Sequence, residues 1–227
     1  MSETGEHCAP DASLVIATGC AHCQAVLVAL ANLVKEGAVG RLEVVNVTVR
    51  PEAARGLDIR SLPWLRLGRL EFTGLMRLEE LRRWAEQADT EEGLQAYFLE
   101  QLATGQMPAV AAYVRSKPDA VVSLVRLLGD PSSEMQVRLG VDAILEELDD
   151  ERVAAMAVQV LADLTLSGNA RTRADACHAL RLTRLPQAVA VLKECLADAD
   201  GEVRETAEES LQALTEAGMP DAPGGAA

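Results

Sequence analysis

Two cysteines separated by two residues, in the run Cys20-Ala21-His22-Cys23, are the side chains whose types and spacing best suit chemistry. An apolar run at 13–18, which predicts a buried strand, precedes them, and apolar residues at helical spacing follow. We therefore expect the pair at a helix N-terminus, where unpaired N–H groups and the helix dipole stabilise a thiolate. With a nearby imidazole, such a position lowers the pKa of a cysteine from about 8.5 to about 3.5–7.5.

Each residue of this motif has an expected role. Cys20 is the exposed, ionised nucleophile, and Cys23, one helical turn later, is the resolving thiol. His22 lies between them and stabilises the thiolate when it is protonated. Cys20 would attack a disulfide of a partner protein to form a mixed disulfide, which Cys23 would release. Such thiol–disulfide exchange needs no cofactor.

Two other interpretations of the motif stay open. Zinc accepts ligands of the kinds that Cys8, Cys20, His22 and Cys23 provide. We expect Cys8 to lie in a flexible tail, however, and therefore predict no metal site. Alternatively, the domain serves only for docking, and its two thiols are idle or regulatory.

The other cysteines predict no disulfide framework. The chain has five cysteines, an odd number without the regular spacing of a disulfide-rich scaffold. Cys177 and Cys195 fall on adjacent expected helices. We expect both to pack in the core, with a second redox pair as the alternative.

The elements that must position the motif indicate a small α/β domain. Strands are expected at 13–18, 41–49 and 70–73 and at the end of the run 57–67, helices at 24–36 and 76–88, and a short helical segment at 51–55. Their order is β-α-β-α-β-β-α. Asp89-Thr90-Glu91-Glu92 is typical of a helix N-cap region, which predicts a domain over 13–89 that ends there.

This domain resembles the thioredoxin superfamily in a minimal form. Besides the cysteine pair, the run Gly56-Leu57-Asp58-Ile59-Arg60-Ser61-Leu62-Pro63 resembles the family's loop that ends in a cis-proline. The resemblance implies that Pro63 is cis and lies beside the cysteines, in a loop whose backbone pairs with an extended substrate. The Ala-His dipeptide between the cysteines is closest to that of disulfide isomerases.

The chain departs from the family pattern at several positions. Gly19 replaces the tryptophan before the first cysteine, and Leu14 stands where classical thioredoxins keep a buried aspartate. Trp64 follows the proline in place of threonine, and the N-terminal βα extension is missing. These differences leave the exchange chemistry possible and the range of partners open.

After residue 90 the pattern is helical throughout. Helices are expected near 91–103, 106–115, 118–128, 133–147, 150–166, 169–183, 186–198 and 200–216. Three aligned stretches contain Arg138, Arg173 and Arg204, which lie 35 and then 31 residues apart, a period typical of helical solenoids.

These repeats resemble the short bacterial HEAT family. Residues 192–204 contain its pattern of leucines, an aspartate-rich turn and then Val203-Arg204. The resemblance covers about 118–216 and implies that the repeat arginines pair with neighbouring aspartates to hold successive repeats together. We expect a HEAT-like α-solenoid over 90–217, whose concave face binds a partner protein.

Charge narrows the classes of partner. The formal net charge is −14, of which residues 90–227, with 11 basic and 23 acidic side chains, contribute −12. Acidic surfaces repel phosphate, so we expect neither nucleic acid nor an anionic membrane as a ligand. Six arginines between Arg60 and Arg83 predict either a basic patch near the cysteines or a solvated helix face.

No apolar run is long enough to span a membrane, and no secretory n-region is present, so we expect a cytosolic protein. We also expect flexible tails at 1–12 and 218–227. Two functions follow from these features. The first is disulfide exchange on a partner protein that the repeats select. The second is an interaction scaffold or redox-sensing adaptor that uses both domains for docking. The oligomeric state is not predicted.

Overall fold

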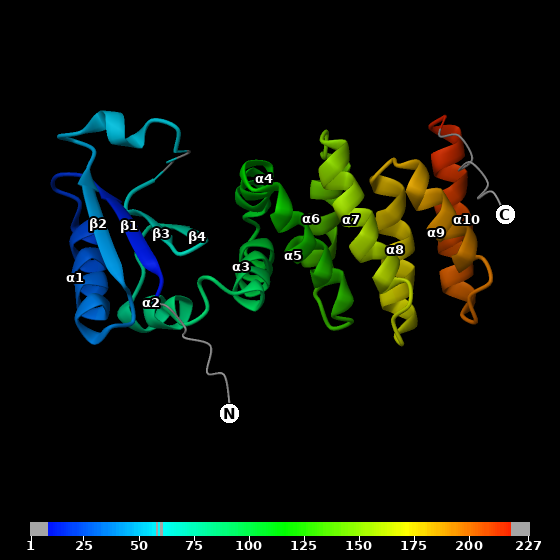
Figure 1. The fold of residues 1–227 in the computed structure, drawn as a ribbon, viewed down its shortest axis with the longest axis horizontal. Helices are drawn as coiled ribbons and strands as arrows, with labels where there is room; N and C mark the ends of the chain where they lie inside the picture. Colours follow the sequence, from blue (N-terminus) through cyan, green and yellow to red (C-terminus); the bar gives the residue numbers. More distant parts are fainter. Residues whose placement is uncertain (1–8, 58, 60, 219–227) are drawn as a thin grey trace, which may run out of the picture. The chain divides into compact units, whose positions relative to one another are not determined.

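The computed structural model describes residues 9–57, 59 and 61–218 (Figure 1). These residues divide into two compact units, and the division falls between Leu94 and Gln95. The expected domain limits of 13–89 and 90–217 stay predictions. The first eight residues and the last nine, which make up most of the expected tails, lie outside the described part.

A mixed four-stranded sheet forms the centre of the first unit, in the order β2-β1-β3-β4 (Figure 1). The strands are β1 (Asp11–Ile16), β2 (Arg41–Asn46), β3 (Trp64–Leu67) and β4 (Leu70–Thr73). β1 is parallel to β2 and antiparallel to β3, and β3 forms a hairpin with β4. On one face, Leu14, Leu65 and Phe72 lie side by side and are buried. This face forms the core of the unit.

Two helices complete that core, α1 (Ala21–Glu36) and α2 (Leu78–Ala85). α1 places Val26, Leu30 and Leu33 toward the core at helical spacing. Gly37 ends α1 in the left-handed conformation, with φ 79°, and its N–H bonds the carbonyls of Leu33 and Val34. α2 contacts α1, and the Trp84 ring lies 5.5 Å from the Phe72 ring between centroids. Both helices therefore share one layer.

The connection between β2 and β3 contains a short 3-10 helix, η1 (Pro51–Ala54), as the proline at its first position predicts. The two units meet in sequence within α3 (Glu91–Ala103).

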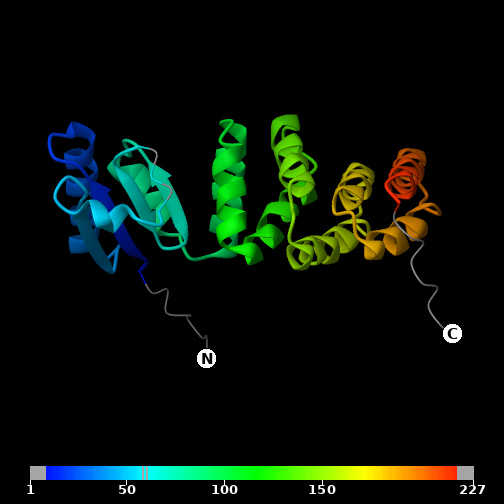
Figure 2. The same cartoon turned by 90° about the horizontal axis from the view of Figure 1, so that it is seen from above.

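The second unit is helical. Its elements are α4 (Met107–Ser116), η2 (Pro118–Ala120), α5 (Val121–Val125), η3 (Arg126–Gly129), α6 (Met135–Glu146), α7 (Glu151–Leu164), α8 (Ala170–Leu182), α9 (Pro186–Cys195) and α10 (Gly201–Glu216). α6, α8 and α10 pack in one layer, and α5, α7 and α9 pack in the other (Figure 2). The expected class, a thioredoxin-like α/β domain followed by a HEAT-like helical stack, is confirmed.

One expected helix is divided. Residues 118–128 form two 3-10 turns around the five-residue α5. Pro118 opens the segment, and the tighter i→i+3 bonding at both ends shortens the α-helical part. The apolar pattern alone does not distinguish these two kinds of helix.

Arg138 on α6 links two successive repeats. Its guanidinium donates to the carbonyls of Ser133 at 3.1 Å and Asp130 at 2.9 Å, in the turn before its own helix. It also donates to the carboxylate of Asp175 on α8. The side chain is 5% exposed, so these bonds are shielded from water.

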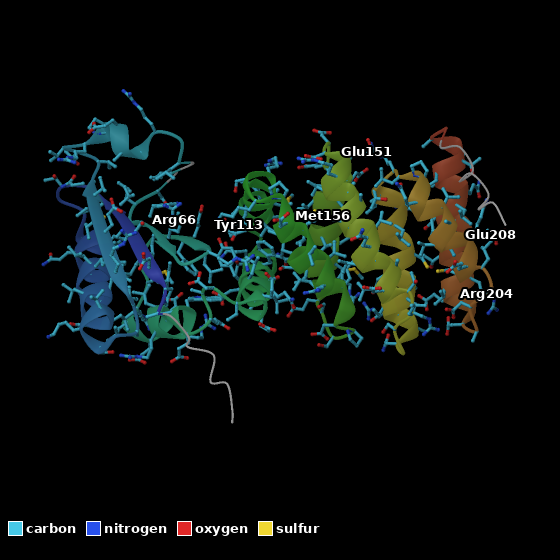
Figure 3. The ribbon with its side chains drawn as sticks, viewed as in Figure 1. Arg66, Tyr113, Glu151, Met156, Arg204 and Glu208 are labelled. Atoms are coloured by element: carbon cyan, nitrogen blue, oxygen red, sulfur yellow. A yellow bond between two sulfur atoms is a disulfide. The ribbon has the colours of Figure 1, made fainter. Side chains whose placement is uncertain are left out.

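Arg173, in the next repeat, behaves in the same way. It donates to the Ser167 carbonyl at 3.0 Å and makes two bonds of 2.8 Å to the Asp198 carboxylate. Arg204 on α10 (Figure 3) donates to the carbonyls of Asp198 at 2.6 Å and Ala199 at 3.0 Å. The expected pairing with neighbouring aspartates is therefore confirmed for the first two arginines, whereas the third, among the residues described, bonds carbonyls of the turn.

Candidate active site

Three loops meet at one end of the sheet. β1 and β2 are parallel and in register, Ile16 beside Asn46, so the segments that follow them leave from the same end. Trp64 opens β3 opposite Val15, in an antiparallel pair. Pro63, the residue before it, therefore lies at the end of β1 from which the chain continues to Cys20.

Cys20 and Cys23 form a disulfide at this end, with their Cα atoms 5.3 Å apart. Cys20 is the N-cap of α1: its backbone is extended, and its sulfur accepts a hydrogen bond of 3.2 Å from the Cys23 N–H. Cys20 is half-buried, whereas Cys23 is 2% exposed. Cys20 is therefore the more accessible residue of the pair.

His22 and Pro63 are the other two residues of the expected site. His22 is exposed in the first turn of α1. The Leu62–Pro63 peptide bond is cis, and the Pro63 carbonyl accepts a bond of 2.8 Å from the Gly74 N–H. The roles of His22 in stabilising a thiolate and of Pro63 in pairing with substrate stay predictions.

A hydrogen-bond network that no sequence motif predicts supports the loop carrying Cys20. The Thr18 N–H donates to Thr48 Oγ1 at 3.1 Å, and the Asn46 amide donates to Thr18 Oγ1 at 3.1 Å. The Thr48 N–H donates in turn to Asn46 Oδ1 at 2.9 Å. The only sequence signal for this network is a polar residue just beyond each of two parallel strands.

The backbone conformation of Gly19 favours glycine at this position, where the family has tryptophan. Its φ is +78°, in the left-handed region that side chains rarely adopt, although a Cβ there would meet nothing within 4 Å. A side chain such as tryptophan is therefore disfavoured at this position by the backbone conformation.

Among the residues that the structure describes, no buried acid lies in the first unit to assist the second thiol. Leu14 is 0% exposed, and within the described residues of the first unit no charged side chain is buried. Trp64 is 3% exposed, with the guanidinium of Arg66 on β3 (Figure 3) 5.7 Å from its ring centroid.

The described residues contain no group of three or more His, Cys, Asp and Glu that could hold a metal ion. Cys8, which the zinc interpretation requires, lies outside them. Nor is any helix in the described ranges long and apolar enough to span a membrane.

Cys177 and Cys195 lie in the core of the second unit, 0% and 7% exposed. A hydrogen bond between their side chains raises the pKa of Cys177 and lowers the pKa of Cys195 to about 7. Thr165 also bonds Cys195 and lowers its pKa. This burial fits the expectation of core packing.

Comparison with known proteins identifies both parts of the chain. A family model described as a thioredoxin domain matches residues 13–86, and one described as HEAT repeats matches residues 143–212. No curated protein matches the chain. The chain therefore joins a thioredoxin-like domain to HEAT-like helical repeats, and repeats of this kind commonly mediate protein interactions.

Proposed function

We propose that this chain, a thioredoxin-like domain joined to HEAT-like repeats, exchanges disulfides with a partner protein that the repeats select. The observation that carries the proposal is the asymmetry of the cysteine pair: Cys20 is accessible at a helix N-terminus, and Cys23 is buried one turn behind it. Nucleophile and resolving thiol need these two different environments.

The reaction starts from the dithiol form. The Cys20 thiolate, which the Cys23 N–H and the helix N-terminus stabilise, attacks one sulfur of the partner disulfide. A mixed disulfide forms, and the other partner sulfur leaves as a thiolate. The Cys23 thiolate then attacks the Cys20 sulfur, which closes the Cys20–Cys23 disulfide and releases the partner as a dithiol.

Two electrons pass from the chain to its partner in this direction. The Cys20–Cys23 disulfide is the product, and a dithiol reductant restores the reduced form. In the reverse direction, the same steps transfer the disulfide to a partner dithiol. The reduction potentials of the two pairs decide which direction prevails.

The repeats are proposed to select the partner. Ion pairs from Arg138 and Arg173 join successive repeats into a continuous stack. Leu139 on α6 and Leu166 after α7 remain 59% and 82% exposed. Exposed apolar side chains on a solenoid of this kind are suited to protein contact.

A trapping experiment tests the proposal. The Cys23→Ser variant of the full chain should keep a partner bound to Cys20 as a mixed disulfide that dithiothreitol releases. The double variant Cys20→Ser/Cys23→Ser should retain nothing. Adding Leu139→Glu to the trapping variant should lower the yield of the same partner, because it places a charge on the repeat surface.

If Cys23→Ser and the double variant retain the same proteins, disulfide exchange is excluded and the scaffold alternative is favoured. If neither Leu139→Glu nor Leu166→Glu lowers the yield of the trapped partner, the exchange chemistry stands. The repeat surface at these leucines then does not select the partner.

A further inference from the structure

Cys177 and Cys195 are two thiols that the proposed exchange reaction does not use. Cys177 lies within α8, and Cys195 is the last residue of α9. Both are free cysteines, and both are buried in the helical unit. Their side chains contact each other through a hydrogen bond. Two thiols in contact become a disulfide when two electrons and two protons are removed.

The ion pair between Arg173 and Asp198 explains why the two sulfurs meet. α9 packs against α8 (Figure 1), and two bonds of 2.8 Å, from Arg173 Nε and Nη2 to the Asp198 carboxylate, hold the two segments in register. Cys177 lies one helical turn after Arg173 on α8, and Cys195 lies a similar distance before Asp198. Because α9 runs back along α8, the same register places the two cysteines opposite each other. The contact is therefore built into the packing of the repeat.

The two thiols are not equivalent. The hydrogen bond between them raises the pKa of Cys177 and lowers the pKa of Cys195 to about 7. This is the pattern of a Cys177 S–H that donates to the Cys195 sulfur. Thr165, the C-cap of α7, also bonds the Cys195 side chain. Cys195 is thus the better nucleophile of the two, and it is also the less buried one.

We propose that Cys177 and Cys195 are a second redox pair, which a peroxide closes to a disulfide that cross-links α8 to α9. This inference does not depend on the proposed exchange reaction. Burial sets the class of oxidant: Cys177 is 0% exposed and Cys195 7% exposed, so we expect a molecule as small as hydrogen peroxide to react and a bulky disulfide to be excluded.

The oxidation takes two steps. The Cys195 thiolate attacks one oxygen of hydrogen peroxide, which breaks the O–O bond, forms a sulfenic acid and releases hydroxide. The Cys177 sulfur then attacks the sulfenic sulfur, and the oxygen leaves as water with the Cys177 proton. The two cysteine sulfurs lose two electrons in total, and the peroxide gains them.

The cross-link would restrain the same two segments that the Arg173–Asp198 ion pair joins. A disulfide between residues 177 and 195 closes a loop in the unfolded chain and lowers its conformational entropy. We therefore expect the unfolding temperature of the helical unit to rise by several degrees on oxidation. Thermal unfolding of the oxidised and reduced forms measures this shift.

A variant that keeps only these two thiols tests the inference. Cys8→Ser/Cys20→Ser/Cys23→Ser in the full chain leaves Cys177 and Cys195. Hydrogen peroxide is added to the folded variant, and non-reducing peptide mass spectrometry identifies the products. We expect one Cys177–Cys195 cross-link within the chain, and recovery of both thiols by dithiothreitol in urea. Dithiobis(nitrobenzoate), a bulky aromatic disulfide, should react on the order of tenfold more slowly with the folded variant than with the urea-unfolded one.

Further substitutions in this variant assign the roles. With Cys177→Ser, peroxide should convert Cys195 to a sulfenic acid that dimedone traps. With Cys195→Ser, Cys177 should stay unmodified over the same time. Arg173→Met removes the ion pair that sets the register and should slow cross-linking several-fold. Arg152→Met, whose arginine is 88% exposed, is the matched control and should leave the rate unchanged.

Several results would overturn the inference. Peroxide could leave both thiols intact, oxidise Cys195 to a sulfinic acid without a cross-link, or join separate chains. Equal rates of cross-linking in the folded and urea-unfolded variant would count against it as well, and so would an oxidised form that unfolds at a lower temperature. If dithiobis(nitrobenzoate) reacts equally fast with both, burial does not select the oxidant. Because the variant lacks Cys20 and Cys23, none of these results bears on the proposed exchange reaction.

Discussion

The carboxylate of Asp142 on α6 faces the imidazole of His178 on α8, with Oδ2 and Nε2 3.6 Å apart. Burial, and then repulsion from Asp175, raises the pKa of Asp142 to about 6. Burial also lowers the pKa of His178. The charged groups that act on Asp142 from the two helices are Asp175, Arg181, Arg138 and Glu146.

Replacing Asp142 with asparagine should stabilise the protein at neutral pH. The folded-state pKa lies above the ordinary value of 3.8, so the folded state binds the proton more tightly. The resulting stabilisation is present below about pH 4 and is lost as the pH rises through 6. Urea unfolding should therefore find Asp142→Asn more stable than the parent by about 1–2 kcal/mol at pH 7.5, with a smaller difference at pH 4.5. A difference that does not change with pH would contradict this assignment.

Removing the Arg138 guanidinium should destabilise the helical stack. Arg138→Met leaves the carbonyls of Asp130 and Ser133 and the carboxylate of Asp175 without this donor in a site where the side chain is 5% exposed. The expected loss in the free energy of unfolding is about 2–4 kcal/mol, measured by urea. The matched variant Arg152→Met, whose ion pair with Asp150 has an arginine 88% exposed, should unfold at the same urea concentration as the parent.

The hydrogen bonds among Thr18, Asn46 and Thr48 should affect both the stability of the protein and the reactivity of Cys20. Asn46→Ala removes the donor to Thr18 and the acceptor for Thr48. We expect a loss of about 1 kcal/mol in stability and a several-fold slower exchange reaction, because the loop that carries Cys20 is less well held. Glu43→Ala, on the same strand, should leave the exchange rate unchanged. Equal effects of the two substitutions would argue against a positioning role for Asn46.

Alkylation of the reduced chain should distinguish the two thiols. Iodoacetamide should modify Cys20 well below pH 7, because a helix N-terminus and the Cys23 N–H stabilise its thiolate. Cys23, 2% exposed, should react more slowly. Peptide mass spectrometry measures both rates against pH, with Cys23→Ser, which leaves Cys20 as the one thiol of the motif, as the control. If Cys20 titrates like an ordinary thiol, the docking alternative gains support.

Local patterns in the sequence determined most of the elements. The cysteine pair between a strand and a helix, Gly37 at the end of that helix, and the hairpin at Gly68 are encoded within a few neighbouring residues. The period of Arg138, Arg173 and Arg204 likewise predicted the stacked helices, and the resemblance to HEAT repeats implied the aspartate partners that the first two arginines have. Such features are accessible because helix and strand periodicities repeat over short distances.

Only the tertiary structure decided which distant side chains meet. Thr18, Asn46 and Thr48 become a network because β1 and β2 pair in parallel register. The raised pKa of Asp142 likewise depends on burial between α6 and α8 and on Asp175, which α8 brings beside it. Pairing, burial and repulsion act between residues far apart in the chain, so no local pattern encodes them.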